Sequence, residues 1–288
     1  MMNTNTTEIL QQLTGAIHKI ITPEAIYLLG NRNARHTLQS IYHTPAAMQD
    51  PTPVHVYVLI VAPLDNIPMH EWLDKTEARC RRIIPVTLII KETTVFEKLA
   101  QEGNPFVCRI LSSAECLYRS VRFQTKKYSS VAERSEKKES ILAKGYDMYR
   151  QFMAGAELFH IREHYRSAGF LLHQAAELGL HSILKSATGL DFRSDNIERL
   201  VAYTSLVHEA LYDWITVNRE KVLLHKLQQA YSRSRYDENY TITHTEFNEL
   251  KALISQLDPY FLQSKPLQTP QDIRICHTRY NNSNRLLH

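Results

Sequence analysis

Apolar and polar residues in the first half of the chain follow two alternating patterns. Three short apolar runs have the length and composition of buried strands, at residues 25–29, 55–61 and 85–90. Helical spacing of apolar residues predicts four helices, at residues 6–20, 34–42, 69–81 and 95–101. The prolines of residues 44–53 predict a loop. Strands that alternate with helices predict an α/β layer structure for this half.

The pattern changes after residue 118. Residues 119–139 hold seven lysines and arginines against three glutamates, which is typical of a polar, basic linker. Beyond the linker only helical periodicity is found, and it predicts helices at residues 141–162, 165–187, 196–206, 208–231 and 244–261. The tail from residue 265 has two prolines and little periodicity, so we expect it to be loosely ordered.

These patterns predict an α+β protein with two domains. A small α/β domain covers residues 1–118, the basic linker covers residues 119–139, an all-α bundle covers residues 140–264, and the tail covers residues 265–288. A chain of 288 residues is long enough for each domain to bury a core of its own.

Composition excludes several classes of protein. The chain is 43% hydrophobic and 22% charged, which is normal for a globular protein, and no run approaches the roughly 18 apolar residues of a membrane span. The N-terminus lacks the basic and apolar regions of a signal peptide. Four scattered cysteines without a CxxC pair suggest neither a disulfide framework nor a zinc ribbon. We therefore expect a cytoplasmic protein with no membrane partner, no cofactor and no metal. The net charge of +4 does not indicate a particular binding partner.

Three motifs in the helical half resemble one family. Residues 174–177 read Gln-Ala-Ala-Glu and are followed by Gly189, where a helix C-cap glycine is expected. Residues 195–200 resemble a short helix that usually begins with histidine, here Asp195. Arg235 and Tyr236 match a later Arg-Tyr-Pro stretch. In this order the motifs resemble the HEPN family over residues 140–261. The alternative is an unrelated helical bundle that presents these motifs by chance.

The HEPN resemblance implies one candidate catalytic pair. Many members of the family are metal-independent ribonucleases that use an arginine and a histidine four to six residues apart, and Arg219 and His225 have this spacing. His225 would transfer protons and Arg219 would stabilise charge on the phosphate. Glu220, however, would repel a phosphate. On a continuous helix the pair would lie about 120° apart, which favours an ordinary surface pair.

The N-terminal half resembles the minimal nucleotidyltransferase domain, which often precedes HEPN. Its first strand reaches Gly30 in the expected place, with Asn31 where the family has serine. His55 and Tyr57 then occupy the two positions of the metal-binding Asp-x-Asp motif on the next strand. Thr87 occupies the position of the third carboxylate.

Without these carboxylates the resemblance implies an inactive enzyme, because Mg²⁺ requires oxygen ligands of high charge. A turn at Gly30, Asn31 and Arg32 is then the candidate nucleotide- or phosphate-binding site, and the HEPN motif adds Arg235. The alternative is that His55 and Tyr57 pack or face solvent.

One further motif is the zinc-protease pattern HxxEH at residues 160–164. It lacks an evident third ligand, so we interpret it as structural.

The resemblances together imply a nucleotide- or RNA-associated regulatory module of the kind found in toxin–antitoxin or defence systems. The alternatives are a metal-independent HEPN ribonuclease and a structural dimerisation scaffold. The apolar residues of the helical half further predict a homodimer that pairs through this domain.

Overall fold

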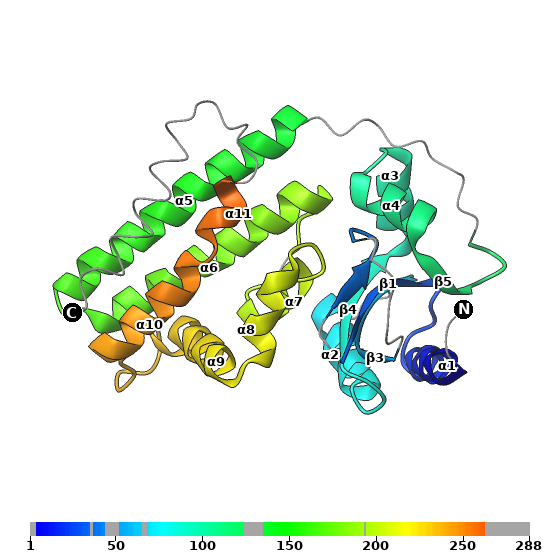
Figure 1. The fold of residues 1–288 in the computed structure, drawn as a ribbon, viewed down its shortest axis with the longest axis horizontal. Coiled ribbons are helices and arrows are strands. Elements are labelled where there is room, and N and C mark those ends of the chain that lie inside the picture. The colour runs from blue at the N-terminus through cyan, green and yellow to red at the C-terminus, as the bar shows by residue number, and fades with distance from the viewer. Residues whose placement is uncertain are drawn as a thin grey trace.

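The computed structural model describes residues 4–34, 37–43, 52–64, 68–123, 135–192 and 194–262. In Figure 1 an α/β half lies beside a helical half. The α/β half comprises α1 (Thr4–His18), β1 (Ala25–Asn33), β2 (Leu38–Ser40), β3 (Pro53–Ala62), α2 (Met69–Cys80), β4 (Val86–Glu92), α3 (Thr93–Gln101), α4 (Pro105–Ser113) and β5 (Glu115–Arg119). The mixed α+β fold is thus as predicted, with the sheet in the N-terminal half.

The sheet has the strand order β2-β1-β3-β4, and β5 pairs with β1 beside β2. β1 is antiparallel to its three partners, whereas β3 and β4 are parallel. The three predicted strands are confirmed. The helix predicted at residues 34–42 is wrong, because residues 38–40 pair with β1 as a short strand and bury Leu38. α4 and β5 were not predicted.

The two faces of the sheet carry separate hydrophobic clusters, because successive residues of a strand point to opposite faces. Ile26, Val56 and Val58 belong to the face that α1 and α2 cover. Tyr27 and Tyr57 belong to the other face, where α3 and α4 pack. The helical half completes this second cluster with Leu184, Leu190, Phe192, Tyr203 and Leu206. The hydrophobic core is therefore continuous between the two halves.

The helical half comprises α5 (Ser135–Ile161), α6 (Tyr165–Thr188), α7 (Ile197–Thr204), η1 (Glu209–Tyr212), α8 (Asp213–Thr216), α9 (Asn218–Arg233), α10 (His244–Ser255) and α11 (Asp258–Leu262). The single helix predicted at residues 208–231 is wrong. Val217 has an extended backbone, with φ −75° and ψ 125°, and separates α8 from α9. This β-branched residue fits an extended conformation better than a helix.

The start of the helical half differs from the predicted boundary at residue 140. α5 begins at Ser135, within the basic segment predicted as a linker. Residues 124–134, the tail and most of the proline-rich loop lie outside the described residues. Among the helices that the structure describes, none is both long and apolar enough to cross a membrane.

Candidate functional site at the domain interface

Three residues at the predicted carboxylate positions converge on one face of the sheet. The parallel register places Tyr57 of β3 beside Thr87 of β4. Two positions away on the same strand, the ring of His55 lies 4.9 Å from the ring of Tyr57. His55 Nε2 lies 2.9 Å from Thr87 Oγ1, within hydrogen-bond distance. The shared face expected from strand alternation is thus present, and all three side chains are buried.

Arg32 of β1 lies next to this cluster and is 1% exposed. Its Nε donates a hydrogen bond to the Tyr57 hydroxyl at 3.0 Å. Its Nη2 donates to the carbonyl oxygens of Ser205 at 3.0 Å and of Glu209 at 3.3 Å. Its Nη1 lies 3.5 Å from a carboxylate oxygen of Glu209, and the guanidinium lies 4.1 Å from the ring centroid of Tyr212. Residues 205–212 of the helical half, which we call the α7–η1 segment, therefore contact the arginine through two backbone carbonyls, one carboxylate and one aromatic ring.

Neighbouring bonds extend this contact. Tyr57 shares a 2.8 Å hydrogen bond with the Ser205 hydroxyl. A carboxylate oxygen of Glu209 accepts a bond from the Leu38 amide at 2.7 Å, which ties η1 to β2. On the β4 edge, the Tyr203 hydroxyl donates to the Leu88 carbonyl at 3.1 Å. We call this set, together with Arg32 and Tyr212, the Arg32 interface.

α7 also binds α2 through charged groups. Arg199 Nη2 lies 2.7 Å from the carboxylate of Asp74 and 3.2 Å from that of Glu77. Glu77 is buried and also accepts a bond from the Leu88 amide at 3.3 Å. α7 is therefore bound both to the sheet and to α2, the helix that covers the opposite face of the sheet.

The electrostatics of the Arg32 interface differ from those of a magnesium site. Burial, with the charges of Arg32 and Arg81, lowers the pKa of His55 to about 3, so its imidazole is neutral near pH 7. Burial raises the pKa of Tyr57 and raises that of Tyr212 to about 12, so both phenols are neutral as well. Nowhere in the described residues do three His, Cys, Asp or Glu side chains gather as metal ligands would.

Gly30 lies within β1 and not in a turn. A Cβ atom at this position would lie 2.5 Å from the Gln39 carbonyl oxygen and 2.7 Å from Ser40 Cβ. The glycine therefore permits the close approach of β2. Asn31, the next residue, is buried, and its side-chain oxygen has no hydrogen-bond partner within the described part of the chain.

Arg219 and His225 lie on α9, which is continuous from Asn218 to Arg233. Both residues are exposed. Arg219 forms an ion pair with Glu249 at 3.3 Å, and His225 Nε2 lies 2.8 Å from Gln229 Nε2. A continuous helix separates the pair by about 120°, as expected, so a single chain does not bring them to one phosphate.

Arg235 follows α9 and lies away from the Arg32 interface. Its guanidinium is 4.4 Å from the ring centroid of Tyr231 and 5.3 Å from that of Tyr236. The Tyr231 ring in turn stacks on His173 of α6 at 4.6 Å. None of these contacts is shared with Arg32, so the structure does not combine the two arginines in one site.

The HxxEH motif falls where α5 gives way to α6. α5 ends at Ile161, Glu163 has a φ of 61°, and His164 is the N-cap of α6. His160 stacks on Phe247 of α10 with a ring distance of 3.9 Å. The two histidines therefore do not share a helix face, as a zinc protease would require.

Sequence reasoning missed the partners of Arg32. Ser205 and Glu209 lie 173 and 177 positions further along the chain. They belong to no motif that the sequence reveals, and neither periodicity nor spacing links them to β1. Only the tertiary fold identifies them.

Residues 150–257 match the HEPN domain family. The match confirms the HEPN resemblance of the helical half, and HEPN domains are RNA- or nucleotide-related modules. It does not extend to the α/β half, whose nucleotidyltransferase likeness stays a prediction. A search of curated proteins gives no match to the chain.

Proposed function

We propose that this protein is a nucleotide- or RNA-associated regulatory module whose α/β half no longer transfers nucleotides and instead holds the HEPN domain. The Arg32 interface carries the proposal. His55, Tyr57 and Thr87 stand where the nucleotidyltransferase resemblance implies three metal-binding carboxylates, and the α7–η1 segment accepts hydrogen bonds from the adjacent Arg32. The HEPN match over residues 150–257 supports the association with RNA or nucleotides.

The chemistry of nucleotidyl transfer supports the loss of activity. Mg²⁺ neutralises the triphosphate and is held by carboxylate oxygens. A neutral imidazole bonded to Thr87 and a neutral phenol bonded to Ser205 supply no such charge.

The charge at the interface supports the regulatory role that we propose. Glu209 is the carboxylate partner of Arg32, and its side chain is 49% exposed. Arg32 itself is buried, so a phosphate group competes for the guanidinium only when the half-exposed Glu209 carboxylate moves aside. Binding of a nucleotide or of an RNA end would thus loosen the contact between β1 and η1. This would change how the HEPN domain is held against the sheet.

The first test is enzymatic. With Mg²⁺ and a labelled nucleotide, transfer to the protein, to RNA or to a small acceptor should stay at background, because no carboxylate is present at positions 55, 57 and 87. Robust Mg²⁺-dependent incorporation would contradict the proposed loss of activity.

The second test concerns the interface. Arg32→Met removes the donors to Tyr57, Ser205 and Glu209 and should lower the free energy of unfolding by about 2–4 kcal/mol in urea titrations. Glu209→Gln is the matched control. Since this carboxylate is half-exposed, its loss should cost no more than about 1 kcal/mol. An Arg32→Met protein as stable as wild type would show that the interface does not hold the domains.

A further inference from the structure

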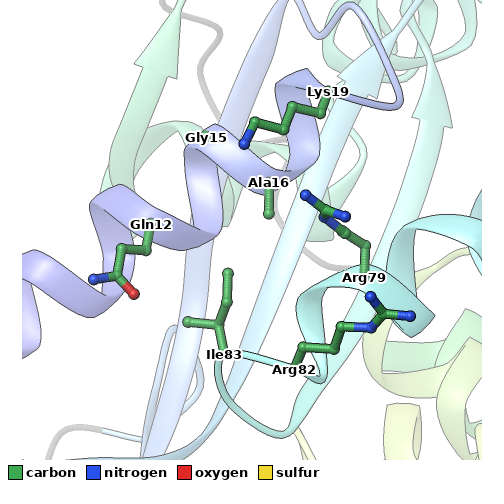
Figure 2. A pocket seen from close by; sticks show the side chains of 7 residues that line it. All are labelled: Gln12, Gly15, Ala16, Lys19, Arg79, Arg82 and Ile83. Carbon is green, nitrogen blue, oxygen red and sulfur yellow. The ribbon is translucent and has the colours of Figure 1, made fainter.

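A second feature of the α/β half is a pocket between the ends of α1 and α2. It is lined by Gln12, Gly15, Ala16, Lys19, Arg79, Arg82 and Ile83 and has a volume of about 520 Å³. In Figure 2 Lys19 follows the end of α1, Arg79 comes from the last turn of α2, Arg82 and Ile83 come from the turn after it, and Gln12 lies further back on α1. We call it the α1–α2 pocket.

The charged side chains that line the pocket are all cationic, and they lie beside the Gln12 amide and the apolar residues Ala16 and Ile83. Among the described residues, no carboxylate forms an ion pair with Lys19, Arg79 or Arg82. Other basic residues of α2 differ in this respect. Lys75 pairs with Glu71 at 3.5 Å, and Arg81, just after the helix, pairs with Glu77 at 3.3 Å. Lys19, Arg79 and Arg82, which line the pocket, thus have no carboxylate partner in the part of the chain that the structure describes.

Helix dipoles do not account for these charges. Cations are common at helix C-termini because each end carries about half a negative charge. Two such ends meet at the pocket, so they offset about one of its three positive charges. Backbone turns also satisfy part of the terminal carbonyls, with bonds from Ile21 to Ile17 at 2.9 Å and from Ile83 to Cys80 at 2.9 Å. The pocket retains a net positive charge.

Gly15 keeps the floor of the pocket open. A Cβ atom at this position would meet no atom within 4 Å. The volume lies within the range of small-molecule sites. No aromatic side chain lines the pocket, so nothing there would stack on a base. The ligand is therefore recognised by charge and hydrogen bonds, through the Gln12 amide and the three cationic groups.

The cations are also confined to a small area. α1 itself contains no lysine or arginine over its sequence TNTTEILQQLTGAIH. A nucleic acid strand needs positive charge spread along its backbone, because each phosphate contact adds to the affinity. Three cations at two adjacent helix ends suit a compact polyanion better.

We propose that the α1–α2 pocket binds a linear polyphosphate group, either free or as the phosphate chain of a nucleoside triphosphate. The pocket is formed on the sheet face that α1 and α2 cover, whereas Arg32 contacts Tyr57 on the other face. The inference therefore stands independently of the Arg32 interface.

Isothermal titration calorimetry of the full chain at low ionic strength tests the proposal with two probes, sodium tripolyphosphate and ATP. Binding of either probe supports it when an Arg79→Gln/Arg82→Gln double variant weakens that binding at least about tenfold, as expected from the loss of charged hydrogen bonds. If both bind alike, the phosphate chain alone is recognised; if only ATP binds, the nucleoside contributes as well.

Two further variants keep the test independent of folding. Gly15→Glu places a carboxylate over the open floor without removing a cation, and it should also weaken binding at least about tenfold. Lys75→Gln, on the same helix but paired with Glu71, is the control and should leave the affinity within about twofold. Melting curves verify that each variant is folded.

Four results would overturn the proposal. One is the absence of binding by both probes at about 1 mM, the limit of weak association. Another is binding that survives both the double variant and Gly15→Glu. The third is ATP binding that depends on Arg32 and not on Arg79, which would move the ligand to the Arg32 interface and leave the proposed function intact. An RNA oligonucleotide that binds through the pocket while tripolyphosphate does not would equally refute a compact ligand.

Discussion

Gly30 shows how the role of a residue depends on a neighbour in space. A side chain at this position would collide with the backbone of β2, because the Gln39 carbonyl oxygen lies 2.5 Å from the place of a Cβ atom. The sequence shows a glycine at the end of an apolar run, which equally fits a phosphate-binding turn. The close approach of residues 38–40 cannot be read from the sequence, because their pattern resembles a helix.

Gly30→Ala should therefore destabilise the protein. The methyl group has to displace backbone atoms of β2, so we expect a loss of about 1–3 kcal/mol in the free energy of unfolding. Gly15→Ala is the opposite control, because its Cβ atom has open space in the middle of a helix. It should add up to about 1 kcal/mol. Equal effects of the two substitutions in urea titrations would rule out this account of Gly30.

Strand alternation is a local rule that does predict one feature of the site, the shared face of His55, Tyr57 and Thr87. Their convergence follows from strand alternation, and the sequence was sufficient to expect it. The identity of the group beside them was not predictable, because Arg32 bonds to residues more than 170 positions away. Local periodicity carries no information about such contacts.

At the scale of elements, most helices and strands follow from hydrophobic periodicity. The errors fall where the periodicity is ambiguous or interrupted. The break at Val217 divides a helical pattern that runs on to either side, so the sequence predicts one helix where the structure has three separate elements, η1, α8 and α9. By contrast, Thr243 and Glu246 form a capping box that marks the start of α10, a signal visible in the sequence.

The continuity of α9 decides what to expect of Arg219 and His225. Leu223 and Leu224 between them are buried, so the helix is held by its apolar face while the two polar residues point to different sides. We expect no RNA cleavage in the presence of EDTA by the wild-type protein above the level of an Arg219→Ala/His225→Ala variant. The substitutions should each change stability by about 0.5 kcal/mol or less.

Cleavage without metal that both single substitutions abolish would establish the ribonuclease alternative. In that case a second copy of the chain has to bring its own pair to a shared cleft, because one α9 cannot close on a phosphate.

At the scale of the whole molecule, three histidines make stability depend on pH. Burial lowers the pKa of His55 to about 3 and the pKa values of His173 and His208 to about 4. In the unfolded chain each titrates near its ordinary value of about 6.5. Below that pH the unfolded state binds more protons than the folded state, so stability falls as pH falls from about 6.5 towards 4.

The measurable result is a loss of at least about 2 kcal/mol in the free energy of unfolding between pH 7 and pH 5. His55→Gln removes one titrating group while keeping a donor for Thr87, and its pH dependence should be shallower than that of wild type. Urea titrations at both pH values give the comparison. An identical slope for the two proteins would mean that His55 is not a buried neutral group.

The helical half also predicts how copies of the chain associate. Met148, Leu158, Phe159 and Ile161 of α5 are exposed apolar residues, at 38–76% relative exposure. We expect a homodimer that covers this surface, and light scattering should give about twice the 33.4 kDa chain mass. Leu158→Glu should shift the protein towards monomer, whereas Met69→Glu on α2 should not. A monomeric wild-type protein at tens of micromolar concentration would refute the prediction.

The boundary between the two halves could be predicted from the sequence, but the packing of one half against the other could not. Composition and periodicity mark the change near residue 118, and the HEPN match falls within the helical half. The continuous core between them was not predictable, because Leu184 and Tyr203 read as ordinary core residues of a bundle while they pack on the sheet. Burial patterns in sequence do not tell which partner an apolar residue meets.

The continuous core also determines the order in which parts of the protein can complete their folding. During synthesis the N-terminal half leaves the ribosome first, as domains commonly do. The face of its sheet that carries Tyr27 and Tyr57 then lacks the residues of α6 and α7 that cover part of it. This half must wait, partly uncovered, until the chain through Leu206 has emerged. Translation speed across that interval, and chaperone access during it, thus become determinants of yield.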